Sequence, residues 1–87
     1  MHLQRVPDER LEEELGKVTD PREPAVPVEV YLGLDARWWD GELHGWAPNP
    51  QGDDGSLRGL VVAPREYAAG FWVEYIGWVT PERLRQR

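Results

Sequence analysis

The sequence feature that most constrains the fold is an alternation of apolar and polar side chains over short segments. In residues 37–46 (RWWDGELHGW), Trp39 and Leu43 fall on one face of an extended chain, whereas Trp38 and Trp46 fall on the opposite face among charged side chains. This period of two is typical of a β-strand that buries one face. We therefore expect Trp39 in the core and at least one of the other two indole rings partly exposed.

Three further segments combine residue types that favour strands, and they are separated by turns rich in glycine and proline. They cover residues 26–32, 57–63 and 71–79, and residues 80–85 (TPERLR) predict a short helical turn. The buried face of residues 57–63 cannot be assigned from the pattern. Four or five short strands with no helix between them predict a mainly β fold, either an antiparallel barrel or a strongly bent sheet.

Residues 1–24 differ from the rest of the chain because they contain no Phe, Trp or Tyr. Residues 7–18 begin with proline and acidic side chains and carry a narrow apolar stripe, which predicts a helix. Three prolines in residues 19–27 predict an extended linker. We therefore expect a helical extension with its linker over residues 1–24, dispensable for folding, and a β domain over residues 25–87. Whether the helix packs on that domain, binds a partner or stays solvated is left open.

The charge distribution disfavours binding to nucleic acid, which requires a basic face. The net charge is −6, both predicted parts are acidic, and the one basic cluster is Arg83, Arg85 and Arg87. No apolar run is long enough for a transmembrane helix. The lack of cysteine and of an apolar signal region leads us to expect a cytoplasmic protein.

The sequence offers few groups for catalysis or metal binding. His2 and His44 are the only histidines, and a catalytic triad or a zinc site needs more partners. Residues 53–56 (DDGS) lack the spacing of a calcium loop, and no glycine-rich phosphate loop is present. We therefore expect no enzyme activity, no metal and no cofactor.

Two segments resemble SH3-like domains. Residues 38–43 (WWDGEL) are similar to the strand with a paired tryptophan, and residues 77–84 (GWVTPERL) are similar to the closing segment that enters a short 3₁₀ turn. The resemblance implies a small five-stranded antiparallel SH3-like barrel. The short connection at residues 33–36 makes the chain more similar to the Tudor and agenet branch. Short actinobacterial proteins are similar as well.

The resemblance also implies where ligands would bind. In SH3 domains the residue matching Trp38 is the floor for polyproline ligands, but Thr80 and Arg83 stand here where that family uses proline and tyrosine. In Tudor-like domains, aromatic rings and a carboxylate hold a methylated cation. The residues that the resemblance assigns to such a cage are Trp38, Tyr67 and Trp72, with Asp35 or Asp40.

Together, the alternation and the closing segment predict both a core and an exposed aromatic patch. The predicted core is Val28, Val30, Trp39, Leu43, Val79 and Leu84. We expect a non-catalytic protein-interaction module, with a partner-binding patch of Trp38, Trp46, Tyr67, Trp72 and Asp40. One alternative is a structural or self-associating domain whose patch is covered by a second copy or by the N-terminal helix. A less favoured alternative is a nucleic-acid-binding module whose rings stack on bases.

Overall fold

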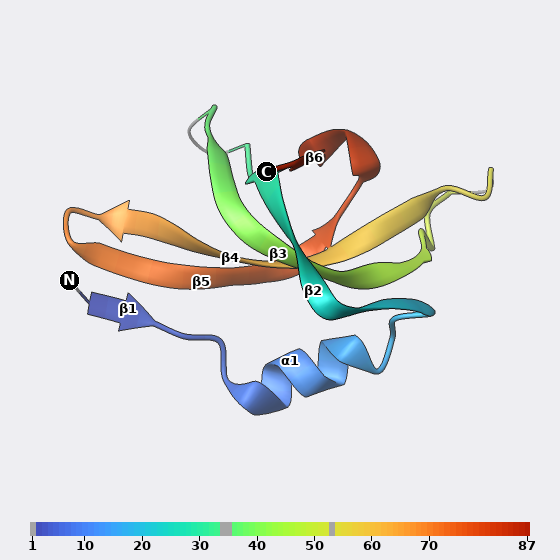
Figure 1. Cartoon of the computed structure of the whole chain (residues 1–87), viewed down its shortest axis with the longest axis horizontal. Coiled ribbons are helices and arrows are strands. Elements are labelled where there is room, and N and C mark those ends of the chain that lie inside the picture. The colour runs from blue at the N-terminus through green and yellow to red at the C-terminus, as the bar shows by residue number, and fades with distance from the viewer. Residues whose placement is uncertain (1, 34–35, 53) are drawn as a thin grey trace.

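A computed structural model describes residues 2–33, 36–52 and 54–87 of the chain. Within these ranges, six strands form one sheet and a single α-helix lies beside it (Figure 1). The elements are β1 (His2–Gln4), α1 (Asp8–Leu15), β2 (Asp20–Tyr31), β3 (Trp38–Pro48), β4 (Leu57–Ala68), β5 (Phe71–Val79), the 3₁₀ turn η1 (Pro81–Arg83) and β6 (Leu84–Gln86). The strand order is β1-β5-β4-β3-β2-β6, and every neighbouring pair is antiparallel except β1 with β5.

The prediction of a mainly β fold is confirmed, but the described strands do not form a closed five-stranded barrel. β1 is a sixth strand on the outer edge of β5, and β6 pairs with β2 at the opposite edge. Because β1 and β6 are not paired with each other, the sheet is open. The sequence did not predict β1, since three residues with one apolar side chain are too short to show an alternation.

A β-bulge in β3 changes which residues face the core. Leu43 pairs with Val61, but Gly45 pairs with Leu60, so β3 advances by two residues where β4 advances by one. Such a bulge bends the strand and increases its twist. Close approach of β3 to β4 also requires Gly41, because a Cβ there would lie 2.7 Å from the Cβ of Ala63.

The predicted core is largely confirmed. Val28, Val30, Trp39, Leu43 and Val79 are buried, whereas Leu84 is half-buried and packs against the core from β6. The structure adds Leu60, Val61 and Ala63 of β4 to the buried residues. Adjacent residues of a strand point to opposite faces, so the burial of both Leu60 and Val61 shows that β4 is covered on both faces. This explains why no single buried face could be assigned to residues 57–63.

The N-terminal segment covers the face of the sheet that carries Leu60 and Trp78. Leu60 pairs with Trp78 in the β4–β5 ladder, and the indole Nε1 of Trp78 donates a hydrogen bond to Oε2 of Glu14 in α1 (2.8 Å). Val18, which follows the helix, contacts Gly45 of β3. Figure 1 shows α1 beside the strands, in continuation of β1, which pairs with β5 at the edge of the sheet. The helix that the sequence left unplaced is therefore docked on the strands.

The predicted linker is partly a strand. β2 begins at Asp20, which pairs with Trp46, and the ladder shifts register between Pro21 and Val26. The helix ends at Leu15, three residues earlier than the sequence suggested, and Gly16 follows it. Glycine is a poor helix former, which accounts for the early end. The domain boundary near residue 24 stays a prediction.

The contact between α1 and the sheet predicts a dependence of stability on pH. The indole of Trp78 and the neighbouring Lys17 and Arg10 hold the pKa of Glu14 below its ordinary value of 4.5, although burial acts in the opposite direction. A carboxyl group with a lowered pKa in the folded state stabilises the protein above its ordinary pKa. This contribution is lost as the pH falls through the folded-state pKa.

We therefore expect the Glu14→Gln variant to be less stable than the wild type at pH 7, with a difference that shrinks as the pH falls below about 4.5. Urea denaturation of both proteins between pH 3 and pH 7 measures this difference. A gap that stays constant over the whole range would show that the charge of Glu14 does not contribute.

Candidate functional site

Three of the five predicted site residues line one pocket. Trp38, Asp40 and Trp72 surround a volume of about 290 Å³ between the start of β3 and the β4–β5 hairpin. We call this the tryptophan pocket, and its lining residues are Arg37, Trp38, Trp39, Asp40, Pro64 and Trp72. Trp72 of β5 pairs with Glu66 of β4, and its ring contacts that of Trp39 in β3.

The rings of the tryptophan pocket are held by contacts within the chain. Trp39 is buried and meets Trp72 edge to face, with centroids 5.8 Å apart and an angle of 86° between the ring planes. This geometry is favourable for two aromatic rings. The guanidinium of Arg37 lies 3.9 Å from the ring centroid of Trp39, at cation–π distance. A cation of the chain itself thus already lies beside these rings.

Trp38 is half-buried on the polar face of β3 for a reason that the sequence did not reveal. It pairs with Tyr31 of β2, and the two ring centroids are 5.6 Å apart. The guanidinium of Arg85 lies 4.1 Å from the ring centroid of Trp38, and its Nε is 2.8 Å from Oε1 of Glu29. Pairing of β6 with β2 places Arg85 there. Trp38 is therefore partly covered and less accessible than its position in the alternation suggested.

Tyr67 lines a second pocket, at the tip of the β4–β5 hairpin. We call it the hairpin pocket; its volume is about 570 Å³, and it is lined by His2, Gln4, Tyr67, Ala68, Phe71, Trp72 and Val73. Tyr67 is 76% exposed and Phe71 is 56% exposed. Trp72 also lines the tryptophan pocket, so the two pockets are neighbours. Two large aromatic side chains are thus left open to solvent beside a hollow in the surface.

Trp46 lines neither of these two pockets, because the bulge in β3 places it on a different face from the one that the alternation predicts. Beyond the bulge, Trp46 pairs with Gly59, on the same face of β4 as Val61. This returns Trp46 to the face of Leu43, where it is half-buried against the core. The simple alternation of residues 37–46 had placed it on the opposite face because an extra residue in a strand cannot be seen from the pattern.

The sequence also missed the exposed apolar side chains of β5. Phe71, Val73 and Tyr75 alternate on one face of this strand, and each is at least 36% exposed. The residues between them are Trp72 and Glu74, so both faces of the segment carry apolar side chains. Apolar residues on both faces of a strand near the edge of a sheet could have indicated that one of the two faces is exposed to solvent.

The cage that the Tudor resemblance implies is divided between two pockets. Tyr67 lines the hairpin pocket, Trp38 and Asp40 line the tryptophan pocket, and Trp72 lines both. The side chain of Asp40 is 65% exposed and lies 3.8 Å from the guanidinium of Arg87. Asp35, the other proposed carboxylate, lies outside the described residues.

Comparisons with protein-family models, curated proteins and solved structures find no match for this chain. Within residues 2–33, 36–52 and 54–87, no three His, Asp or Glu side chains are grouped so as to hold a metal ion. In the same part of the chain, no helix has the length and apolar character needed to cross a membrane. The interpretation of the site therefore depends on its own geometry.

Proposed function

We propose that the protein is a non-catalytic interaction module, located in the cytoplasm, that binds a partner protein through the β4–β5 hairpin. The observation that carries this proposal is the hairpin pocket, with Tyr67 and Phe71 exposed at its edge. Exposed aromatic side chains that gather around a hollow are typical of binding surfaces, and a few such anchors dominate binding energy. Trp72 packs edge to face on the buried Trp39, so this side of the surface is supported by the core.

We also propose an SH3-like arrangement for residues 25–87. Support comes from the order β6-β2-β3-β4-β5 and from the turn η1, which leads directly into the strand that pairs with β2. Arg83, which stands at the tyrosine position of SH3 domains, lies 5.9 Å from the ring centroid of Tyr31. A polyproline platform at this place lacks its usual tyrosine, which favours the hairpin as the binding surface.

The alternative of nucleic-acid binding is weakened by the contacts of the basic cluster. Arg85 is paired with Glu29, and Arg87 lies near Asp40 and donates a hydrogen bond to the carbonyl oxygen of Gly41. Arginines engaged in this way are less available to phosphates, and the net charge of −6 repels them. Self-association through the hairpin is the stronger alternative because it would use the same exposed side chains.

A double variant, Tyr67→Ala with Phe71→Ala, tests the proposed function. Both side chains are exposed, so we expect each substitution to change the free energy of unfolding by only about 0.5 kcal/mol. Affinity for the partner should fall roughly 30-fold or more, since paired aromatic anchors contribute about 2 kcal/mol or more. Pull-down from a native lysate compares the amount of partner protein that the double variant and the wild type capture. Sedimentation at several concentrations measures self-association.

Leu57→Ala is the matched control. Leu57 is also an exposed apolar residue of β4, 44% exposed, but it lies at the opposite end of that strand from Tyr67. We expect the Leu57→Ala variant to capture as much partner protein as the wild type does. Loss of self-association alone in the double variant would favour the dimer, and equal behaviour of all three proteins in both assays would refute a binding role for the hairpin.

A further inference from the structure

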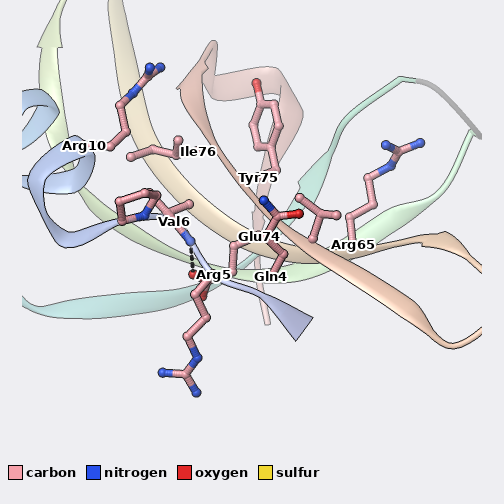
Figure 2. Close-up of a pocket in the computed structure, with 10 residues that line it drawn as sticks. Gln4, Arg5, Val6, Arg10, Arg65, Glu74, Tyr75 and Ile76 are labelled. Carbon is pink, nitrogen blue, oxygen red and sulfur yellow. Dashed lines mark hydrogen bonds between the residues drawn. The ribbon is translucent and has the colours of Figure 1, made fainter. Parts of the chain in front are cut away.

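A third pocket adjoins the hairpin pocket along β5. Its volume is about 380 Å³, and it shares Gln4 and Val73 with the hairpin pocket. Figure 2 shows it where the chain leaves β1 and turns into α1. We call it the arginine pocket, because Arg5, Arg10 and Arg65 are among its lining residues.

The arginine pocket exists because β1 is shorter than β5. β1 pairs with β5 only as far as Val73, after which the chain turns through Val6 and Pro7 into the helix. The backbone N–H of Val6 donates a hydrogen bond to Oε1 of Glu74 (2.9 Å), which fixes this turn against β5. Val6, Pro7 and Ile76 therefore give the pocket an apolar lining. This lining contains one acidic residue, Glu74, against three arginines.

The rim of the arginine pocket is positive. Figure 2 shows the guanidiniums of Arg10 and Arg65 on either side of Tyr75 and on the same side as its hydroxyl, whereas Arg5 points the other way. Among the described residues, Arg65 has no carboxylate within 4.0 Å, and its buried Nε has no hydrogen-bond acceptor. Arg10 has one distant ion pair, 3.9 Å from Glu14. In a chain of net charge −6, this is a local site for a negative group.

We propose that the arginine pocket binds the acidic side chains of an extended partner segment whose apolar side chains enter the hairpin pocket. This inference rests on the proposed function and names the chemistry of its partner. Guanidinium groups form strong, charge-assisted hydrogen bonds with carboxylates. The apolar lining, continuous with the hairpin pocket through Val73, fits a peptide better than an isolated phosphate. An acidic segment complements Arg10 and Arg65, while apolar side chains match Tyr67 and Phe71.

Selection from a library of random displayed peptides tests the inference with the full chain as bait. For the wild type we expect enrichment of Asp and Glu next to apolar residues. For the double variant Arg10→Gln with Arg65→Gln we expect the acidic preference to disappear while the apolar preference remains. Arg5→Gln is the control for loss of positive charge, since it removes one charge from a lining residue whose guanidinium points away from those of Arg10 and Arg65 (Figure 2).

Affinities of individual selected peptides make the test quantitative. We expect the double arginine variant to bind an acidic peptide roughly tenfold or more weakly, as loss of charge-assisted hydrogen bonds predicts, and Arg5→Gln to bind within about threefold of the wild type. Replacing Glu by Gln in the peptide should cause a similar loss. Arg65→Lys, which keeps the charge, should keep the acidic preference and serves as the check if Arg65→Gln disturbs folding.

The outcomes separate this inference from the proposed function. Selected peptides that are apolar without acidic residues would overturn the inference and leave the interaction module in place. An acidic preference that survives in the double arginine variant would overturn it as well. No enrichment of any peptide would count against both this inference and the proposed interaction module. A dimer that is lost on mutation of Arg10 and Arg65 would overturn the inference, because the occupant of the pocket would then be a second copy of the chain.

Discussion

Replacing Trp39 with alanine is expected to lower the free energy of unfolding by roughly 3–5 kcal/mol, the range found for truncating a buried aromatic side chain. Trp39 is 4% exposed, packs edge to face on Trp72, and pairs with Val30 of β2. Its removal leaves a cavity between β3 and the β4–β5 hairpin. For a domain whose total stability is only about 5–15 kcal/mol, the loss is a large fraction.

Urea denaturation followed by far-UV circular dichroism measures this loss. Tyr67→Ala is the control, because Tyr67 is an aromatic residue that is 76% exposed and its truncation should change stability by only about 0.5 kcal/mol. Equal unfolding midpoints for the Trp39→Ala variant and the wild type would show that Trp39 is not part of the stabilising core. The stability of the Trp39→Phe variant should lie between that of the Trp39→Ala variant and that of the wild type, since Phe keeps an aromatic ring in the same place.

Removal of residues 1–19 is expected to destabilise the protein by roughly 3 kcal/mol or more. This shortened chain would begin at Asp20, the first residue of β2. It would expose the face of Leu60, and complete burial of such a side chain contributes about 1.5–3 kcal/mol. It would also remove the hydrogen bond from Trp78 to Glu14, and hydrogen bonds to charged groups contribute about 1.5–3 kcal/mol.

The sequence alone led to the opposite expectation, that residues 1–24 are dispensable, so the experiment decides between composition and contacts. Thermal melts of the full and shortened chains provide the measurement. A second shortened chain that lacks only residues 1–4 tests the contribution of β1 separately from α1. If removing residues 1–19 leaves the melting temperature unchanged, the docked helix contributes nothing and the sequence-based view is right.

The parts of the fold that were predictable are those controlled by local alternation. Burial of Val28 and Val30 was predictable because they alternate with Glu29 and Tyr31 along β2, and a period of two is visible without any tertiary information. The contact of Glu14 with Trp78 joins residues that are 64 positions apart. No local pattern specifies that pairing, so the sequence could not place the helix.

The same distinction applies to the candidate site. Trp38, Asp40 and Trp72 were predicted from residue type and from the resemblance, and the structure brings them together in one pocket. The cover of Trp38 by Arg85 depends on the pairing of β6 with β2, which cannot be read from either segment alone. Trp46 was assigned to the wrong face because a single bulge reverses the alternation, and Gly45 beside the bulge is the one local signal of it.

The pairing of β2 with β6 has a consequence for how the protein is made. Val28 pairs with Gln86, so the outer edge of β2 has no strand beside it until the ribosome has added residues 84–86. Pairing of segments so far apart slows folding, and an uncovered strand edge can pair with other chains in the meantime. The nascent chain should therefore depend more than the finished protein on chaperones that shield such edges.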